Sequence, residues 1–380
     1  MMKSAYIHIP FCEHICHYCD FNKMFLKGQP VDQYLEMLKK EMQLMLQQNP
    51  TDVLSTIYVG GGTPTSLNEE QLIYLCETIK EELPFNRNHI EFTFEANPGD
   101  LSLEKLKILK QFGVNRISFG VQAFQEELLK AIGRTHSIKD VYQSIEQARQ
   151  AGFDNITIDL MYGLPTQTKK QFEETLKLAL ELELPHYSSY SLIVEPKTVF
   201  YNLMQKEKLQ LPTQDSEAEM YEMLMDTMNK HGLIQYEISN FAKPGYESKH
   251  NLTYWNNDYY YGFGAGAHGY VNGERIANHG PLKKYMEPIE KGLLPQLHVH
   301  KVPLNERMEE ELFLGLRKTE GVSINRFKRR YQIDVMELFK IQINDLLNRE
   351  LINIQNDRIS LTRKGKLLGN EVFQTFIGIA

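Results

Sequence analysis

The stretch Tyr6-Ile7-His8-Ile9-Pro10-Phe11-Cys12-Glu13-His14-Ile15-Cys16-His17-Tyr18-Cys19-Asp20-Phe21 decides how the chain is interpreted, because it holds three of the four cysteines in 380 residues. Apolar side chains alternate from Ala5 to Phe11, and this pattern predicts a β-strand that runs into a loop. The loop carries Cys12, Cys16 and Cys19 with C-x3-C-x2-C spacing. Three thiolates on one short loop can converge on a single centre, so we expect a metal site there.

Two kinds of metal site fit this loop. A [4Fe-4S] cluster held by three cysteines leaves one iron free for an outside ligand, which suits chemistry better than structure. A structural zinc site needs four ligands, and His8, His14 or His17 could supply the fourth. Disulfides or a chance grouping are the remaining interpretations. The spacing favours the cluster. Cys76 falls within a helical pattern and is expected to be a buried apolar residue.

The cysteine loop and its surroundings resemble the radical S-adenosylmethionine (SAM) superfamily. In that superfamily the open iron binds the amino and carboxylate groups of SAM, and electron transfer from the cluster cleaves SAM to a 5′-deoxyadenosyl radical. The wider motif Y-x-H-I-P-F-C, with C-D-F at its end, resembles that of the proteins around oxygen-independent coproporphyrinogen III dehydrogenase. Within that group it is most similar to the motif of the HemW-type haem chaperones. The resemblance implies three cofactors: a [4Fe-4S] cluster, SAM and haem.

The first 240 residues alternate regularly between strand and helix patterns. Strand patterns cover 5–11, 53–60, 89–96, 114–120, 155–162 and 186–194, and helical patterns lie between them. Repeated β/α units predict an α/β fold with a parallel sheet and helices packed outside. Pattern alone does not separate an open sheet from a curved barrel. The resemblance implies a partial, TIM-like (β/α)6 barrel that is open on one side.

Polar residues lie at the ends of several of these strands, where ligands bind in such folds. Glycines 60–62 form either a structural turn or backbone that approaches a ligand closely. Glu95 is either a strand-end charge or a site residue. Asp159 lies in an apolar strand, where an unpaired carboxylate is costly, so it is a site residue or a backbone cap. The resemblance assigns SAM contacts to these residues and their neighbours: Tyr6, Tyr18, Gly62, Thr63, Glu95, Gln122, Arg134 and Asp159.

An aromatic stretch in the second half, Lys249-His250-Asn251-Leu252-Thr253-Tyr254-Trp255, contains the only tryptophan. From the residues alone, His250 is either a hydrogen-bonded histidine on a buried loop or an axial haem ligand beside an aromatic surface. H-N-x-x-Y-W is the pattern of HemW-type proteins, so the resemblance implies that His250 contacts haem.

Helical patterns after residue 302 and a hairpin pattern over 351–362 predict a winged-helix-like domain. Earlier, 234–241 alternates as one strand, and a single helix is expected over 335–349. Four basic residues of the C-terminal part form either a ligand-binding patch or a solvated helix face: Arg326, Lys328, Arg329 and Arg330. We expect three parts: a radical SAM core over 1–240, a connecting region over 241–301, and the winged-helix-like domain over 302–380.

Two departures from the dehydrogenases of this group bear on function. Those enzymes carry a further cysteine two residues after the third cluster cysteine, where this chain has Phe21. They also have a longer N-terminal extension than the 11 residues that precede Cys12 here. Both differences argue against coproporphyrinogen oxidation and are shared with the HemW-type chaperones, so the resemblance implies a carrier that binds haem and transfers it to other proteins. A radical SAM enzyme acting on a porphyrinogen or another substrate is the alternative.

Composition sets further expectations. The net charge of −7 argues against nucleic acid as a partner. No leader or apolar run of about 18 residues is visible, and clustered cysteines suit a reducing compartment, so we expect a cytoplasmic protein. The resemblance implies haem and a haem-accepting protein as partners. Such an acceptor could bring the chain to a membrane surface, and two copies could form a homodimer.

Overall fold

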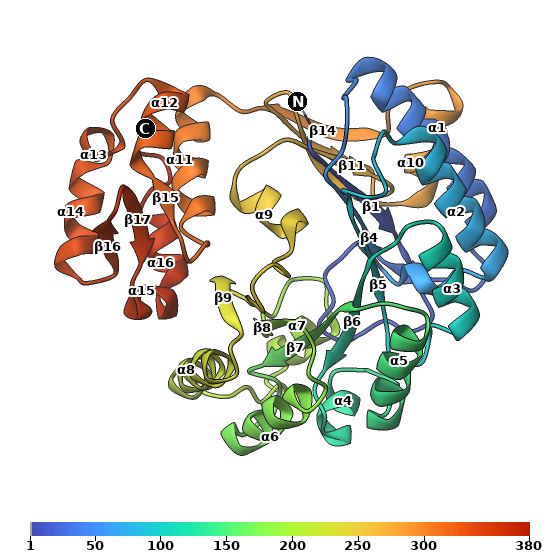
Figure 1. Cartoon of the computed structure of the whole chain (residues 1–380), viewed down its shortest axis with the longest axis horizontal. Helices are drawn as coiled ribbons and strands as arrows, with labels where there is room; N and C mark the ends of the chain where they lie inside the picture. The colour runs from blue at the N-terminus through green and yellow to red at the C-terminus, as the bar shows by residue number, and fades with distance from the viewer. Residues whose placement is uncertain (1) are drawn as a thin grey trace.

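A large α/β unit and a smaller C-terminal unit make up the computed structural model, which describes residues 2–380 (Figure 1). One sheet of 12 strands runs through the larger unit in the order β14-β13-β12-β11-β1-β4-β5-β6-β7-β8-β10-β9. Its centre is parallel and consists of β1 (Ser4–Ile9), β4 (Thr56–Gly61), β5 (Glu91–Ala96), β6 (Arg116–Gln122), β7 (Asn155–Tyr162) and β8 (His186–Ser191).

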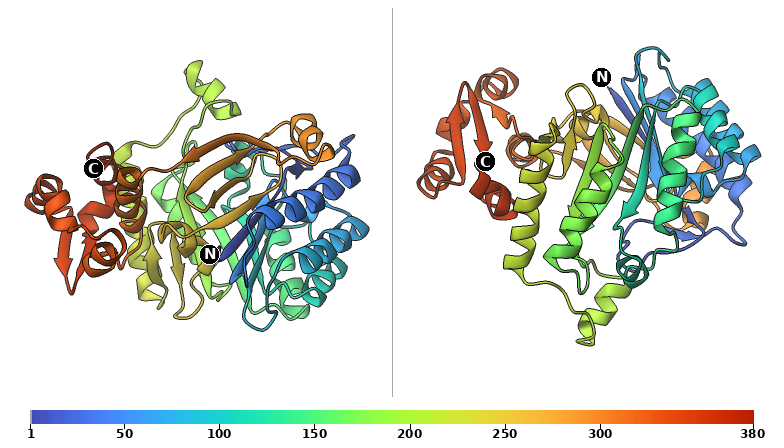
Figure 2. Two further views of the ribbon diagram at one scale, coloured as in Figure 1. Left: turned by 90° about the horizontal axis from the view of Figure 1, so that it is seen from above. Right: turned by 60° about the horizontal axis from the view of Figure 1, so that its bottom comes forward.

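Helices cover the outer face of this central sheet (Figures 1 and 2). They are α1 (Val31–Gln48), α2 (Glu69–Glu82), α3 (Leu103–Gln111), α4 (Glu126–Ala131), α5 (Ile138–Gln150), α6 (Lys169–Leu180) and α8 (Gln214–Lys230). The short helix α7 (Val199–Gln205) stands apart from this layer (Figure 2), and its Phe200 belongs to a separate small apolar cluster. Polar caps fix where several of the helices begin. Asn68, Ser137 and Thr168 each accept a hydrogen bond from the third residue of the helix that follows, which returns one to the cap. These contacts satisfy amide groups that a helix start leaves unpaired.

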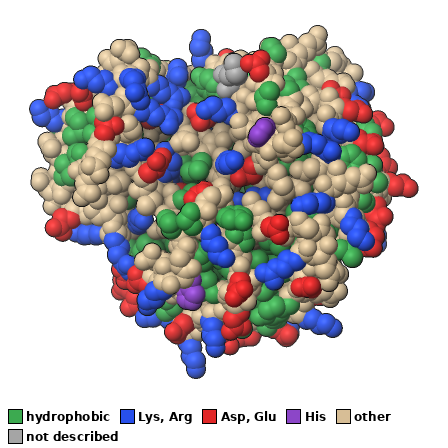
Figure 3. Space-filling model, in the orientation of Figure 1, with side chains coloured by type: hydrophobic (Ala, Val, Ile, Leu, Met, Phe, Trp, Pro, Cys, Tyr) green, Lys and Arg blue, Asp and Glu red, His purple; other side chains and the backbone are tan. Residues whose placement is uncertain are grey.

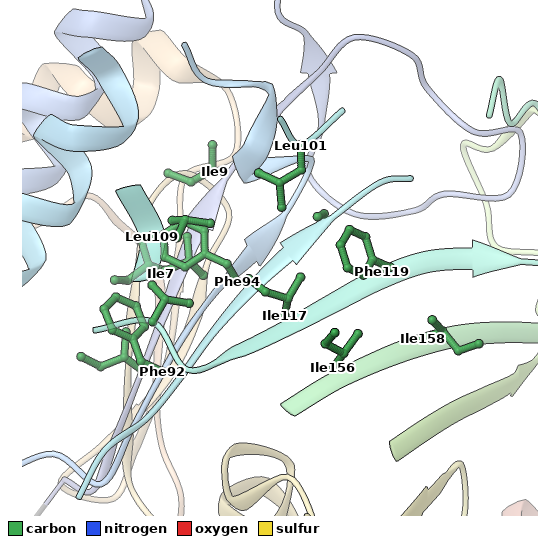
Figure 4. Close-up of a cluster of buried hydrophobic side chains, with 14 of the residues drawn as sticks. Ile7, Ile9, Phe92, Phe94, Leu101, Leu109, Ile117, Phe119, Ile156 and Ile158 are labelled. Atoms are coloured by element: carbon green, nitrogen blue, oxygen red, sulfur yellow. The ribbon is translucent and has the colours of Figure 1, made fainter. Parts of the chain in front are cut away.

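Along each central strand, apolar and polar side chains alternate between the two faces of the sheet. Outward-facing residues such as Ile7, Phe94 and Ile117 form a buried apolar cluster with Leu101 and Leu109 (Figure 4). Because alternate residues of a strand face opposite sides, their neighbours point into the curve of the sheet. Those inward residues are largely polar, and they form the site described below. The predicted α/β barrel-like fold with a C-terminal domain is confirmed.

The sheet extends beyond the six predicted strands on both sides. On one side the expected single strand over 234–241 is wrong, because the chain turns back and forms β9 (Ile234–Glu237) and β10 (Asn240–Ala242) as an antiparallel pair. On the other side, β11 (Tyr260–Phe263) pairs parallel to β1. It continues into an antiparallel series, β12 (His268–Val271), β13 (Glu274–Asn278) and β14 (Gln296–Lys301), beside β1 in Figure 2. The helix α10 (Leu282–Glu290) lies between the last two.

The C-terminal unit has a separate apolar core. Its elements are α11 (Leu304–Gly315), α12 (Ile324–Tyr331), α13 (Val335–Leu338), α14 (Lys340–Asn348), α15 (Arg363–Leu367), α16 (Gly369–Gln374) and a sheet of β15 (Val322–Ser323), β17 (Arg358–Leu361) and β16 (Ile352–Gln355). The helix expected over 335–349 is interrupted at Phe339. Otherwise the order of helices and hairpin is that of the predicted winged-helix-like domain.

The predicted basic patch is partly neutralised by nearby acids. Arg330 lies 2.6 Å from the Glu311 carboxylate, Arg326 lies 3.6 Å from it, and Lys328 lies 3.2 Å from Asp334. Figure 3 shows Lys and Arg side chains over this part of the molecule with acidic side chains among them. These pairs argue against a patch that binds an anionic polymer. Arg326 and Arg330 also donate to the backbone carbonyls of Asn256 and Asn257, so only part of the patch is a solvated helix face.

None of the helices in residues 2–380 combines the length and the apolar character that a bilayer crossing requires.

Candidate functional site

A cavity of about 450 Å³ opens among the central strands and the cysteine loop. Ten of the sequence-predicted site residues line it: Cys12, Cys16, Tyr18, Cys19, Gly62, Thr63, Glu95, Gln122, Arg134 and Asp159. They come from the cysteine loop, β4, β5, β6, β7 and the segment after α4. The structure therefore brings residues up to 147 positions apart, Cys12 and Asp159, onto one wall.

The three cysteines lie on the loop that follows β2 (Phe11–Cys12), which pairs in parallel with β3 (Met24–Phe25). Cys12 is buried, whereas Cys16 and Cys19 are half-buried and free. Burial raises the pKa of the Cys12 thiol to about 11, and the Thr63 hydroxyl, 3.6 Å from its sulfur, acts in the opposite direction. Across residues 2–380, no three His, Cys, Asp or Glu side chains are grouped closely enough to hold a metal ion.

A hydrogen-bond network joins the cysteine loop to the ends of the strands. Arg134 donates through one terminal nitrogen to the Tyr18 hydroxyl, at 3.0 Å, and through the other to the Asn97 amide oxygen. Asn97 in turn donates to the Thr63 hydroxyl at 3.1 Å. The Arg134 Nε is buried and has no hydrogen-bond partner in the described structure. A buried N–H without an acceptor is costly, so this guanidinium is suited to an acceptor group of a ligand.

The glycine-rich turn after β4 makes room for the Glu95 carboxylate. Gly61 has φ +109°, a left-handed conformation, and its N–H donates to Glu95 at 3.0 Å. A Cβ at Gly60 would lie 2.6 Å from the same carboxylate. The Tyr58 hydroxyl donates to the other Glu95 oxygen at 2.6 Å. Burial and then the Asp159 charge raise the pKa of Glu95 to about 7, against the effect of these hydrogen bonds.

Gln122 and Asp159 lie on neighbouring strands. The pairing of β6 with β7 shifts by one residue between Gly120 and Gln122, and Gln122 has φ +69°. This bulge turns the end of β6 and directs Gln122 to the cavity. Asp159 accepts hydrogen bonds from the Ser118 hydroxyl at 3.2 and 3.3 Å. Burial raises its pKa. Both side chains thus present polar groups to a largely enclosed space.

Two predicted residues, Tyr6 and His250, lie outside the cavity lining. The Tyr6 hydroxyl lies 2.9 Å from His8 Nδ1, and its ring stacks on Tyr58 at 6.2 Å. Tyr6 therefore reaches the site through Tyr58.

His250 lies on α9 (Lys249–Trp255) and is 1 % exposed. Its Nδ1 lies 2.8 Å from the Thr56 hydroxyl and its Nε2 lies 2.8 Å from the Tyr254 hydroxyl. Its ring stacks on Tyr58 at 5.1 Å, and burial lowers its pKa to about 3. Both ring nitrogens already have partners. This geometry favours the hydrogen-bonded, buried histidine over the axial ligand, and it places the residue on a helix instead of a loop.

The helix α9 closes the lower end of the barrel. Glu91, at the start of β5, accepts hydrogen bonds from the backbone N–H groups of Lys249 and His250, both at 2.9 Å. At the other end, Arg326 and Arg330 of the C-terminal unit donate to the carbonyls of Asn256 and Asn257. The H-N-x-x-Y-W stretch therefore connects the barrel to the C-terminal unit.

Sequence reasoning missed several cavity residues: Tyr58, Asn97, Arg116, Ser118 and His186. A signal existed for Ser118, because it lies two positions before Gly120 of the lining and so shares its face of the strand. Asn97 directly follows the Glu95-Ala96 pair. Arg116 and His186 begin their strands, where sequence alone gives no reason to expect a ligand.

The residues present fit an iron–sulfur cluster and SAM by donor type. Three thiols stand on one loop at the cavity, and the unpartnered Arg134 Nε and the acceptors Glu95 and Asp159 lie around the same space. Cysteine thiolates are the usual ligands of such clusters, and carboxylates accept hydrogen bonds from ammonium and hydroxyl groups. Zinc would use the same three thiols together with a fourth ligand.

Comparisons with known proteins agree with this geometry. Residues 6–179 match the radical SAM superfamily, and residues 302–368 match the HemN C-terminal domain. A Bacillus subtilis protein named "Heme chaperone HemW" is 58% identical over 99% of this chain and 100% of its own length. A Lactococcus lactis protein of the same name is 48% identical, over 99% of this chain and 97% of its own.

A solved structure has the same fold. The coproporphyrinogen III oxidase HemN from Escherichia coli superposes with a TM-score of 0.86 over 100% of this chain and 91% of that one, at 23% identity. At that identity the likeness establishes the architecture only. The full-length relatives establish more: the chain belongs to the HemW family of the radical SAM superfamily.

Proposed function

We propose that the chain is a haem chaperone, which binds haem and transfers it to acceptor proteins while carrying a [4Fe-4S] cluster and an exchangeable SAM. The observation that carries the proposal is the full-length similarity to relatives named heme chaperones, at 58% and 48% identity. The cavity supports it, because the thiols and the polar strand-end residues that a cluster and SAM need lie around one space.

Cys12, Cys16 and Cys19 would hold the cluster. When reduced, a cluster held there would supply an electron to a bound SAM. Arg134 suits the SAM carboxylate, since its free Nε is already buried beside Tyr18. Glu95 and Asp159 suit the ammonium or the ribose hydroxyls, and Gly62 and Thr63 offer close backbone approach. Gln122 adds an amide, and Tyr6 supports the site through its stack on Tyr58.

The haem site is proposed more broadly. His250 was predicted as a ligand, and its two hydrogen bonds give it another role, that of holding α9 on the barrel. We place haem at the cavity or at the face of α9, where its binding would quench the fluorescence of Trp255. The three-part division at residues 240 and 301, a cytoplasmic location, contact with a membrane through an acceptor, and a homodimer belong to the same proposal.

A second function is kept because seven of the eight residues assigned to SAM line the cavity. A radical SAM enzyme acting on a porphyrinogen would use the same cavity, in which the protein orients the substrate while the cofactor supplies the reactive species. Phe21, at the position of the dehydrogenases' additional cysteine, is 61 % exposed at the cavity and provides no thiol.

One experiment separates the two functions. Cluster-reconstituted protein is incubated without oxygen with SAM, a reductant and coproporphyrinogen III, and haem binding is measured on the same sample through quenching of the single tryptophan. Tight haem binding without protoporphyrinogen supports the carrier. Protoporphyrinogen formed over many turnovers would refute the carrier and establish the enzyme.

A further inference from the structure

The floor of the cavity carries a buried cation. Arg116 begins β6, lines the cavity and is 2 % exposed. One terminal nitrogen donates to the Tyr246 carbonyl at 3.1 Å. No carboxylate within residues 2–380 lies within 4.0 Å of its guanidinium nitrogens, so it has no ion-pair partner there. A guanidinium has five N–H donors, and one carbonyl leaves most of them available.

The neighbours of Arg116 in the described structure form no direct ion pair with it. His186, at the start of β8, lies with Nδ1 2.6 Å from the Thr157 hydroxyl and with Nε2 2.8 Å from the Tyr236 hydroxyl. Burial, and then the Arg116 charge, hold the pKa of His186 well below its usual value, so this ring is neutral. Asp159 lies in the same cavity, where burial raises its pKa and the Arg116 charge acts to lower it, but its carboxylate accepts hydrogen bonds from Ser118 and forms no ion pair with Arg116.

A buried charge without a partner is costly, and natural proteins retain one mainly where a ligand supplies the partner. Arginine suits carboxylates because its planar group can donate two parallel hydrogen bonds to them. Thr157 and Asn251 line the same floor and add neutral polar groups.

We propose that Arg116 binds a carboxylate group of the ligand that enters the cavity. This inference rests on the proposed function, because both ligands considered there, haem and SAM, carry carboxylates. Arg116 and Gln122 begin and end the same strand, and at about 3.3 Å per residue the floor lies roughly 20 Å below the strand end beside the cysteine loop. The floor thus lies away from Arg134, where the SAM carboxylate is proposed to bind, so a haem propionate is the expected source. A SAM carboxylate bound at the floor instead of at Arg134 is the alternative source that the titration distinguishes.

The test compares ligands with and without the carboxylate. Wild type, Arg116→Gln and Arg116→Lys, all cluster-reconstituted, are titrated with haem, haem dimethyl ester and SAM. Arg149→Gln is the matched control, because Arg149 also donates to a backbone carbonyl but lies on the outer helix α5. Haem binding is read from tryptophan fluorescence, SAM binding from equilibrium dialysis, and folding from circular dichroism.

Loss of one charge-assisted hydrogen bond, or of two, corresponds to about 10- to 100-fold in affinity. We expect Arg116→Gln to weaken the affinity for haem by that factor and to leave the affinity for the ester unchanged. The affinity of Arg116→Lys for haem should lie between those of wild type and Arg116→Gln, and the Arg149→Gln control should bind the probes as wild type does. A loss confined to SAM would support the same role with SAM as the carboxylate source. Unchanged affinity of Arg116→Gln for all three probes would overturn the proposal.

Two further results keep the inference distinct from the proposed function. If Arg116→Gln does not fold, wild-type protein still decides the haem source, since equal affinity for haem and its ester overturns propionate binding. Wild-type protein that binds neither haem nor the ester refutes the haem chaperone, while the SAM titration of the Arg116 variants still decides the role of the arginine.

Discussion

The raised pKa of Glu95 predicts a specific pH dependence of SAM binding. Burial and the nearby Asp159 raise this pKa to about 7, and the carboxylate lines the cavity. A cationic ligand binds the ionised form, which is lost as the pH falls below the pKa. The ionised fraction drops from about ten-elevenths at about pH 8 to about one-eleventh at about pH 6, so we expect SAM affinity to fall about tenfold over this range.

Equilibrium dialysis of SAM against reconstituted protein, repeated across this pH range, measures the effect. Glu95→Gln should bind more weakly and lose the carboxylate's contribution to the pH profile, whereas titration of SAM itself remains in both proteins and cancels in the comparison. Glu41→Gln is a matched control, because Glu41 also has a pKa of about 7 but lies outside the cavity. Tyr58→Phe removes a hydrogen bond that lowers the Glu95 pKa, so its profile should move to higher pH.

A wild-type profile that coincides in shape with that of Glu95→Gln would refute the reasoning. So would a Glu41→Gln profile that becomes flat, because the titrating group would then be remote from the ligand.

Three further predictions concern the cluster, α9 and the buried acid of α1. Replacing any of the three loop cysteines by alanine should remove bound iron and its visible absorbance, and Cys76→Ala, buried in α2, should retain both in the same iron assay. His250→Phe leaves the Tyr254 hydroxyl without this partner and removes one of the two partners of the Thr56 hydroxyl, which still donates to Ser4. It should lower the free energy of unfolding by about 2 kcal/mol, with no shift of the haem Soret band; a shifted band would place His250 on the iron. Burial raises the pKa of Glu41 to about 7 in the folded protein, from its ordinary value of 4.5. Its contribution to stability is therefore complete below about pH 4.5 and declines by about 3 kcal/mol as the pH rises through 7. Urea titrations of wild type and Glu41→Gln would show this change, and a difference in unfolding free energy between the two that stays constant with pH would contradict it.

Much of the barrel follows from local pattern. The six predicted strands and their helices agree with the structure to within a few residues, because each helix has an apolar stripe and several have polar caps. The residues quoted from the strand ends meet at one cavity because parallel strands end at the same edge. The order of strands and helices along the sequence was therefore enough to predict that these residues share one site.

Local pattern did not predict the strands after residue 259. The run Gly262-Phe263-Gly264-Ala265-Gly266 is rich in glycine, a composition typical of turns. In the structure, a Cβ at Gly262 would lie 2.0 Å from the His268 carbonyl oxygen, so the glycine permits β11 and β12 to approach closely. A glycine can give a flexible turn or can let two strands approach closely. Which of these it does depends on the partner strand, and sequence periodicity does not reveal that strand.

The roles of Arg116 and His250 depended on three-dimensional information for the same reason. Arg116 looked like the first residue of an ordinary strand, and only the enclosed cavity shows that its charge is unpaired. His250 stood in a motif that suggested a ligand, and only the structure shows that both ring nitrogens are engaged.

The pairing of β1 with β11 has a consequence for synthesis of the chain on the ribosome. Ser4 pairs with Tyr260, so the first strand to leave the ribosome waits for a partner made 256 positions later. At about 5–20 residues per second this delay is roughly 10–50 s. Until then one edge of β1 is open to pairing with another nascent chain. A chain truncated after the sixth β/α unit would keep that edge permanently, and aggregation during translation is its expected fate.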